Sequence, residues 1–287
     1  MSDRVVGCIG LGNMGHALAT NLVAAGHQVV AHDAAGEARN VPGAAWASDA
    51  AAVARAADVV VFSLPDGRVS EAVARQLATA DGRRVATVID TSTIGPAAAA
   101  TVEALLGEVG VAYVDAPVSG GVAGARARTL AVMYAGDDAA VAAAMPVLEG
   151  LSDRLRRVGH RPGLAQAVKL ANNFLSATAL AATSEAVAFG VSVGVDMAVM
   201  LDVLSASSGA NTATTDKFPN HVVTGTYSSG FSNSLMAKDV ALYLDAVGTE
   251  GTPSAFGELV SGTWSSFAAA QPNVDFTRIH RFVNGLD

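Results

Sequence analysis

Cysteine and charged residues are scarce in this sequence. Its 287 residues include one cysteine, Cys8, which excludes an internal disulfide and a multi-cysteine zinc site. Charged residues make up 15% of the chain and leave a net charge of -8. A nucleic-acid-binding protein needs a basic face to displace counterions from phosphates, so this balance argues against a nucleic acid partner. A single thiol suits a reducing compartment, and we expect a cytoplasmic protein.

Long apolar runs without charge are missing as well. Residues 1–12 contain Asp3 and are interrupted by glycine, so they lack the hydrophobic stretch of a signal peptide. The most apolar stretch, residues 186–204, contains Asp196 and Asp202, and carboxylates are unfavourable in a bilayer core. We therefore expect no membrane span.

Hydrophobic residues nevertheless make up 51% of the chain, enough for a large core, and the length suits about two domains. In the first half, short β-branched runs alternate with alanine-rich amphipathic stretches, which is typical of βαβ units and a mostly parallel sheet. Strands are predicted at residues 4–9, 28–32, 59–63, 86–90, 112–115 and 130–134. Helices are predicted between them at residues 14–25, 48–56, 68–78, 96–109 and 139–148.

The alternation ends at Pro162-Gly163. Beyond it a continuous helix is predicted at residues 164–193, and further helices at 196–205, 234–247 and 253–270, with no strand among them. The expected fold class is α/β, with an N-terminal Rossmann-type doubly wound parallel sheet, a long interdomain helix and an all-α C-terminal domain. The corresponding segments are residues 1–161, 162–193 and 194–287.

A GxGxxG pattern directly follows the first predicted strand and opens the first predicted helix. Gly10 permits a tight turn, Gly12 lets the backbone approach a pyrophosphate, and Gly15 lets the helix pack closely on the strand. The positive end of the helix dipole attracts the phosphates. This context predicts a dinucleotide site at Gly10, Leu11, Gly12, Asn13, Met14 and Gly15.

Asp33 lies at the end of the second predicted strand, where a carboxylate accepts hydrogen bonds from the adenosine ribose hydroxyls. A carboxylate repels a 2′-phosphate, and the residues that follow, Ala34 to Gly36, supply no arginine to bind one. We therefore expect NAD as the cofactor and NADP as the less favoured one.

Polar residues recur on one face of the long predicted helix. Their spacings of three and four align Gln166, Lys169, Asn172, Asn173 and Ser176. Because the helix is otherwise apolar, these groups are expected to be buried, and buried polar groups need partners. A bound ligand and a helix–helix polar network are both open on these residues alone.

Two further segments carry polar groups at candidate site positions. Residues 115–121, DAPVSGG, end a predicted strand, where Ser119 and the amides of Gly120 and Gly121 would suit a carboxylate. A tight turn with a serine cap is the alternative, and Asp115 is interpreted as structural. Lys238 lies on a predicted helix in the second half, where a lone lysine is normally a solvated surface charge.

Together these motifs resemble the β-hydroxyacid dehydrogenases, specifically the 3-hydroxyisobutyrate dehydrogenase group. The resemblance covers essentially the whole chain and rests on GLGNMG at 10–15, DAPVSGG at 115–121, GLAQAVKLANN at 163–173 and FSNSLMAKD at 231–239. It implies that Lys169 is the catalytic acid–base. It implies substrate contacts from Ser119, Gly120, Gly121, Asn173 and Phe231. It also implies cofactor contacts from Leu64, Pro65, Thr93 and Lys238.

The reaction that the resemblance implies is reversible hydride transfer between NAD and a small β-hydroxyacid. No metal is expected, since a lysine can polarise the carbonyl. The apolar helices of the second half are expected to bury surface against another subunit, in a homodimer or homotetramer. 3-Hydroxyisobutyrate, serine, glycerate and γ-hydroxybutyrate all fit the motifs. An imine reductase shares the fold and the GLGxMG start but generally replaces the lysine. A non-catalytic NAD-binding regulator would need neither Lys169 nor Asn173.

The sequence departs from the family pattern in two places. The segment between Asp33 and Gly43 is too short for the fuller helix that relatives have, which leaves the wall of the adenine pocket open. Arg128 occupies a position where the family usually has glycine. We expect Arg126 and Arg128 either to be solvated or to alter the preference for substrate charge.

Overall fold

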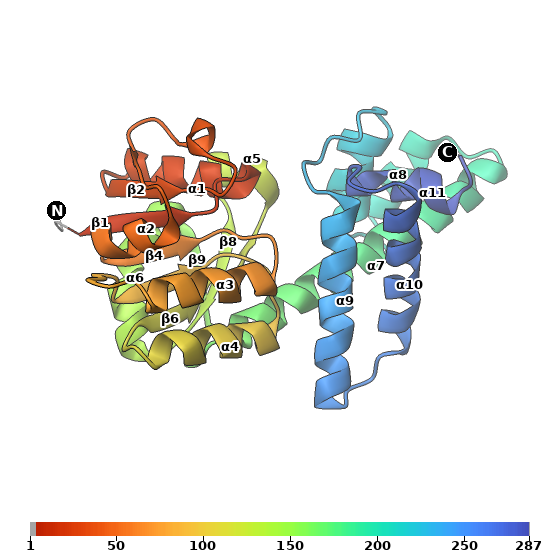
Figure 1. Ribbon diagram of the computed structural model, residues 1–287. Coiled ribbons are helices and arrows are strands. Elements are labelled where there is room, and N and C mark those ends of the chain that lie inside the picture. The colour runs from red at the N-terminus through yellow and green to blue at the C-terminus, as the bar shows by residue number, and fades with distance from the viewer. Residues whose placement is uncertain (1–3, 287) are drawn as a thin grey trace. The chain divides into compact units, whose positions relative to one another are not determined.

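A computed structural model describes residues 4–286, so Asp3 lies outside the described part of the chain. The described residues form two compact units that divide after Lys169. The first unit is an α/β sheet structure and the second is helical, which confirms the predicted fold class (Figure 1). The division falls inside a helix, and the three predicted segments remain a proposal about domain organisation.

The strands all lie in the first unit. They are β1 Val5–Ile9, β2 Gln28–His32, β3 Ala45–Trp46, β4 Val59–Phe62, β5 Thr87–Asp90, β6 Ala112–Asp115, β7 Val118–Ser119, β8 Ala131–Ala135 and β9 Arg154–Gly159. The sheet order is β3-β2-β1-β4-β5-β6-β8-β7, and β9 pairs with β8. From β3 to β6 every pair is parallel, so the carboxyl ends of these strands share one edge of the sheet.

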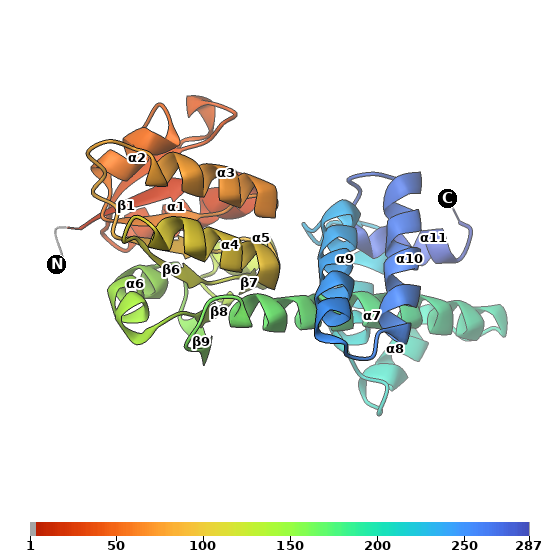
Figure 2. The same ribbon diagram turned by 60° about the horizontal axis from the view of Figure 1, so that its bottom comes forward.

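Helices cover both faces of this sheet (Figures 1 and 2). They are α1 Asn13–Ala24, α2 Ala50–Ala56, α3 Gly67–Ala78, α4 Pro96–Gly107, α5 Gly121–Arg126 and α6 Asp138–Leu151. Leu18 of α1 and Leu148 of α6 belong to the core on one face. Val53 of α2 and Leu77 of α3 belong to the core on the other. Burying both faces explains why the strands are continuous apolar runs.

The predicted strands and helices of the first unit are present, with ends displaced by at most three residues. The short strands β3 and β7, the short helix α5 and the strand β9 were not predicted. Strand β9 contains Arg154, Arg156 and Arg157 and pairs only with β8 among the described strands. An edge strand exposes part of its surface to water and tolerates charge, so apolar patterning does not reveal it.

The second unit consists of helices packed around an aromatic core. Its elements are α7 Leu164–Ser192, which starts in the first unit, α8 Met197–Ser205, the π-helix η2 Ala213–Val222, α9 Asn233–Glu250, α10 Ala255–Ala270, the 3₁₀ helix η3 Phe276–Arg278 and α11 Ile279–Val283. Helices α9 and α10 lie side by side in both views (Figures 1 and 2). Trp264 is fully buried beside Phe267, and its Nε1 donates to Ala177 O at 3.3 Å.

The four helices predicted here are present, while η2, η3 and α11 were not predicted. Asp196, expected as the first helical residue of α8, is its N-cap, because its carboxylate accepts from the amides of Ala198 and Val199.

Helix α7 is, within residues 4–286, the one helix whose length and apolar composition would suffice to cross a membrane. Residues 186–204, where Asp196 and Asp202 disfavour a span, overlap α7 only in part. The absence of a membrane span therefore stays a prediction.

The buried indole should carry much of the stability of the second unit. We expect Trp264→Ala to lower the free energy of unfolding by about 3–5 kcal/mol, because it removes apolar contacts and leaves a cavity. Phe256 lies on the same helix α10 but is 75% exposed, so Phe256→Ala should change the free energy of unfolding by no more than about 0.5 kcal/mol. Denaturant titration followed by circular dichroism measures both. Equal effects would contradict the assigned core.

Candidate active site

The predicted cofactor residues of the first unit follow strands whose carboxyl ends share one sheet edge. Gly10 follows β1, Asp33 follows β2, Leu64 follows β4 and Thr93 follows β5. The sheet order reverses direction between β1 and β4, and ligands of doubly wound sheets bind outside the strand ends at such a point. Residues far apart in sequence are thereby brought to one edge.

The three glycines of the turn after β1 have different surroundings. Gly10 has φ +89°, and a Cβ there would lie 2.3 Å from Ser63 O. A Cβ on Gly15 would lie 1.9 Å from Gly10 O, so both positions require glycine for the fold itself. A Cβ on Gly12 would meet only Arg39 Nη1, at 3.9 Å. The space beside Gly12, at the start of α1, therefore fits the approach of a pyrophosphate.

The Asp33 carboxylate is oriented by backbone amides. Its Oδ2 accepts from Leu11 N at 2.6 Å, and its Oδ1 accepts from Ala35 N at 2.8 Å. Within the glycine turn, Leu11 is buried, Met14 is half-buried and Asn13 is exposed. The turn and the carboxylate expected to bind the ribose are thus tied directly to each other.

The short segment after Asp33 forms a turn and the 3₁₀ helix η1 Glu37–Arg39 in place of a fuller helix. This turn returns the chain toward Asp33, so that Arg39 Nε lies 3.8 Å from Asp33 Oδ1. Ala34 to Gly36 supply no arginine beside Asp33, but Arg39, three residues further along, does. The spacing of residues along the sequence does not predict that Asp33 and Arg39 lie this close in the loop.

The loops after β4 and β5 are joined through Ser92. Leu64 N donates to Ser92 Oγ at 2.8 Å, and Ser92 N donates to Asp90 Oδ1 at 2.9 Å. Leu64 and Thr93 are half-buried, and Pro65 is exposed. These hydrogen bonds hold the two loops in register with each other.

Gln166, in the first turn of α7, is a buried hydrogen-bonding centre. Its Oε1 accepts from the amides of Ile94 and Gly95 at 3.0 and 3.1 Å, and its Nε2 donates to Ser92 O at 3.0 Å. Its backbone N donates to Asp115 Oδ2 at 3.0 Å. The polar atoms of Gln166, the first residue of the predicted polar stripe, therefore have protein partners, but these lie in the segment after β5 and not on a second helix as the network interpretation expected. The hydrogen bond of Asp115 to the backbone of α7 agrees with its interpretation as structural.

Two carboxyl groups are fully buried at this sheet edge, at the ends of β5 and β6. Burial raises the pKa of Asp90 to about 6 and the pKa of Asp115 to about 7. Tyr113 OH donates to Asp90 Oδ2 at 3.4 Å, and burial also raises the pKa of this phenol. Between about pH 4 and pH 6 the pair therefore holds protons that exposed carboxylates would have lost.

Further along α7, Lys169 and Asn173 are 8% and 5% exposed. In the second unit Asn173 Nδ2 donates to Asp239 Oδ2 at 2.5 Å, and Lys238 Nζ lies 3.0 Å from Asp239 Oδ1. Asn172 Nδ2 donates to Asn173 Oδ1 at 3.1 Å. Asp239, which is 3% exposed, was part of the recognised FSNSLMAKD segment but was not predicted as a site residue. Asp239 links Asn173 and Lys238, both of which were predicted as site residues.

Ser119 lies in strand β7 opposite Ala131, so it belongs to the sheet and not to a loop. Gly120 and Gly121 follow with φ +131° and +66°, which L side chains rarely adopt. Ser119 and Gly121 are half-buried and Gly120 is exposed. In the second unit Phe231 is half-buried, with its ring edge-on to Phe276 at 5.7 Å. The substrate contacts of these four residues remain predictions.

Arg128 has a structural role that the sequence did not reveal. Its φ is +58°, and its guanidinium donates to Gly150 O and Glu149 O at the end of α6 and pairs with Asp153 at 3.2 Å. This left-handed backbone favours glycine, the residue expected here from the family resemblance. The guanidinium of Arg128 is therefore only partly solvated, at 32% exposure, and its effect on substrate charge preference stays a prediction. Arg126, the last residue of α5, is exposed.

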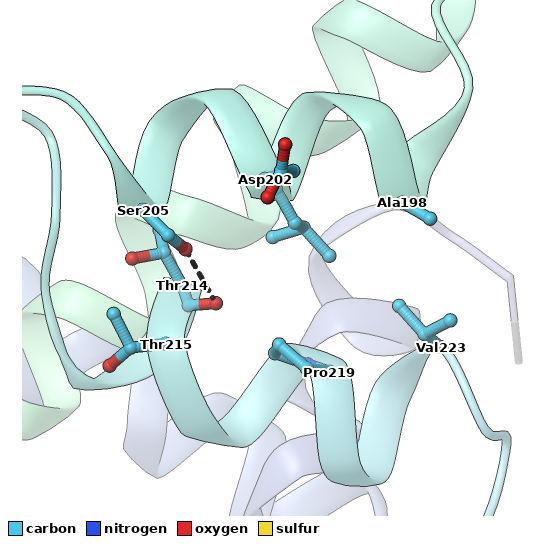
Figure 3. Close-up of a pocket in the computed structure, with 8 residues that line it drawn as sticks. Ala198, Asp202, Ser205, Thr214, Thr215, Pro219 and Val223 are labelled. Atoms are coloured by element: carbon cyan, nitrogen blue, oxygen red, sulfur yellow. Dashed lines mark hydrogen bonds between the residues drawn. The ribbon is translucent and has the colours of Figure 1, made fainter.

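The second unit contains a pocket of about 380 Å³ between α8 and η2 (Figure 3). It is lined by Ala198, Leu201, Asp202, Ser205, Thr214, Thr215, Pro219 and Val223. No predicted site residue lines it, so this pocket does not coincide with the predicted chemistry. Residues 4–286 contain no cluster of three or more histidine, cysteine or acidic side chains that would hold a metal ion.

Because Gly12 and Gly15 have different surroundings, substitution should affect cofactor binding at Gly12 and stability at Gly15. Gly12→Ala should keep the free energy of unfolding within about 1 kcal/mol of wild type, because φ is −63° and the space is open. It should weaken NADH binding at least about tenfold by filling that space. Gly15→Ala should destabilise the fold by about 1–3 kcal/mol through overpacking. Denaturation and NADH fluorescence titration test both, and wild-type binding by Gly12→Ala would remove the pyrophosphate from this position.

The raised pKa of Asp90, about 6 against 3.8 ordinarily, makes stability depend on pH. The unfolded chain loses this proton first as the pH rises, so stability present below about pH 4 is lost by about pH 6. The loss is at most about 3 kcal/mol. Asp90→Asn does not ionise and should reduce this decline, whereas Asp81→Asn, at an exposed position of the same unit, should retain it. Denaturant titrations from about pH 4 to 7 measure the slopes; an unchanged slope in Asp90→Asn would contradict the assignment.

Two family models together match nearly the whole chain. Residues 5–159 match the NAD binding domain of 6-phosphogluconate dehydrogenase. Residues 163–283 match the model described as NAD-binding of NADP-dependent 3-hydroxyisobutyrate dehydrogenase. The first match agrees with the dinucleotide turn described above, and the second covers α7 and the helical unit.

Whole-length relatives point the same way. A 3-hydroxyisobutyrate dehydrogenase of Pseudomonas aeruginosa is 35% identical, with coverage of 97% of this chain and 98% of that protein. An NAD-dependent L-serine dehydrogenase of the same species is 35% identical over 89% of each. The solved structure of Mycobacterium tuberculosis 3-hydroxyisobutyrate dehydrogenase with L-serine matches with a TM-score of 0.88 and 33% identity, covering 98% of this chain and 99% of that one. The chain therefore belongs to the β-hydroxyacid dehydrogenase family, in its 3-hydroxyisobutyrate dehydrogenase-like group.

Proposed function

We propose that this chain oxidises the primary alcohol of a small β-hydroxyacid to the aldehyde, reversibly, with NAD as the preferred cofactor. The observation that carries the proposal is Lys169, buried on the helix whose first turn Gln166 fastens to the dinucleotide edge of the sheet. The similarity to a 3-hydroxyisobutyrate dehydrogenase and to an L-serine dehydrogenase supports this substrate class. Both named substrates carry a hydroxymethyl group one carbon from a carboxylate.

Lys169 is the proposed general base of the oxidation. Its neutral Nζ takes the proton of the substrate hydroxyl while the C–H bond breaks, and in reduction the ammonium returns this proton to the new alkoxide. NAD, when bound, supplies the acceptor for the hydride. A buried amine holds the proton away from bulk water, which suits a transfer coupled to loss of a hydride.

The other predicted substrate-binding residues are proposed to orient the substrate. Ser119 and the amides of Gly120 and Gly121 bind its carboxylate, and Asn173 binds its hydroxyl. Asp239 supports this arrangement, because it accepts from Asn173 Nδ2 and fixes the orientation of that carboxamide.

The remaining assignments concern the cofactor and the pocket wall. The preference for NAD rests on Asp33, which accepts from ribose hydroxyls and repels a 2′-phosphate. Leu64, Pro65 and Thr93 border the cofactor, since they lie in loops at the dinucleotide edge. In the second unit, Lys238 is assigned to the nicotinamide side and Phe231 to the substrate pocket by resemblance to the family.

We also propose that the chain associates into a homodimer or homotetramer. The second unit exposes large apolar side chains on α7, α8 and α10: Phe189 is 70% exposed, Val199 59% and Leu259 69%. Apolar surface of this kind on a folded unit supports burial against another subunit.

Replacing the lysine tests the proposed function. Lys169→Ala should lower turnover about 10²–10⁴-fold while NADH binding persists, because only proton transfer is lost. Lys169→Arg should fail equally, since a guanidinium does not release its proton. Lys217→Ala, at a half-buried lysine of the π-helix, should stay within a few-fold of wild type.

The assay is NADH formation with 3-hydroxyisobutyrate, L-serine, glycerate and γ-hydroxybutyrate, each with NAD and NADP. Turnover of Lys169→Ala near that of wild type would remove Lys169 from the mechanism. NAD binding without turnover of any hydroxyacid would favour a non-catalytic regulator. Reduction of imines alone would favour the imine reductase alternative.

A further inference from the structure

Arg39 lies between the two functional positions of the dinucleotide turn in the first unit. Its Nε lies 3.8 Å from Asp33 Oδ1. Its Nη1 lies 3.9 Å from the position that a Cβ on Gly12 would occupy. The guanidinium therefore reaches from the carboxylate proposed for the adenosine ribose to the glycine proposed for the pyrophosphate.

The backbone around Arg39 is anchored, while its side chain is not enclosed. Gly36, with φ +99°, closes the turn by donating its N–H to Asp33 O at 3.0 Å. Arg39 N donates to Gly36 O at 3.1 Å, and His16 Nδ1 on α1 lies 3.3 Å from Arg39 O. The Arg39 side chain is 50% exposed. The backbone position of Arg39 is thus fixed by the turn, while its exposed guanidinium is free to exchange one partner for another.

The ion pair with Asp33 is weak enough to exchange. A half-exposed pair at 3.8 Å contributes little to stability, because water screens it and Asp33 already accepts two backbone amides. A phosphate monoester carries more charge than a carboxylate near neutral pH, and its oxygens match the guanidinium fork. A 2′-phosphate on the ribose beside Asp33 would therefore compete well for Arg39.

We propose that Arg39 is the 2′-phosphate-binding residue of this chain, so that NADP serves as a second cofactor beside NAD. The inference rests on the proposed dinucleotide site. With NAD, Arg39 stays paired with Asp33, which accepts from the ribose hydroxyls. With NADP, Arg39 turns to the phosphate and offsets the repulsion from Asp33. The preference for NAD is then set by two side chains and is smaller than Asp33 alone would make it.

Calorimetric titration of NAD and NADP, without substrate, isolates this subsite because the two ligands differ only in the 2′-phosphate. Arg39→Gln should weaken NADP binding about ten- to a hundredfold, the loss of one charge-assisted interaction, and should leave NAD binding within about threefold. Arg39→Lys keeps the charge but not the fork, so its NADP affinity should lie between those of wild type and Arg39→Gln.

Arg55 provides a matched control in the same unit. It pairs with Asp49 at 4.0 Å, and its side chain is 48% exposed, close to the exposure of Arg39. Arg55→Gln should leave the affinities for both cofactors unchanged. Circular dichroism confirms that each variant is folded before titration.

The proposal and the proposed function fail in different ways. Equal weakening of NAD and NADP by Arg39→Gln would mean that Arg39 contacts a part common to both, and would overturn the proposal. Unchanged NADP binding in Arg39→Gln, or a wild type that binds NAD but not NADP, would overturn it too and leave the proposed dehydrogenase intact. A folded wild type that binds neither cofactor would overturn both.

Discussion

The hydrogen bonds of Gln166 are the constraint on which the candidate site of the first unit depends. They join the loop after β5 to the first turn of α7, through Ser92, Ile94 and Gly95. All of these groups are buried, so a lost bond would leave polar atoms without water or protein partners. The cost of that loss keeps the beginning of α7 in one place on the sheet edge. The loop that carries Thr93 and the helix that carries Lys169 are therefore parts of one rigid arrangement.

The carboxyl groups beside Gln166 complete this arrangement at an electrostatic cost. Asp115 accepts from the backbone N of Gln166, which satisfies one of the orphan amides at the start of α7. Asp90 Oδ1 likewise accepts from a backbone amide, that of Ser92. Neither carboxyl has an ion-pair partner among the described residues, so burial shifts both toward the protonated form. The backbone amides of Gln166 and Ser92 are therefore hydrogen-bonded to carboxyl groups whose burial disfavours ionisation.

The polar stripe of α7 serves two purposes along its length. At Gln166 it belongs to the network of the first unit, and at Asn173 it belongs to a network of the second, with Asp239 and Lys238. Both positions therefore have protein partners, and the substrate contact of Asn173 stays a proposal. The proposed chemistry is assigned to Lys169, which lies between these two anchored points on the helix.

Prediction from sequence worked where the physical cause is local. The strand–glycine turn–helix succession after β1 is recognisable because a turn with Gly10 at positive φ and close packing at Gly15 require glycine at these positions. Strand β9 and the π-helix η2 were missed, since an arginine-rich edge strand and an irregular helix follow neither apolar period. The hydrogen bonds of the Arg128 guanidinium to the end of α6 were not predicted, because the accepting carbonyls lie 21 and 22 positions away in the sequence.

The sequence by itself determined the order of most helices and strands, the dinucleotide turn and the family, because periodicity and motif spacing are properties of neighbouring residues. The tertiary structure alone decided the partners of the buried and half-buried polar groups. Gln166 and Ile94 are 72 positions apart and Asn173 and Asp239 are 66 apart, yet each pair shares a hydrogen bond. The same holds for Arg39, which reaches Asp33 only because a turn folds the chain back. Such contacts depend on how distant segments pack together, and no local pattern records them.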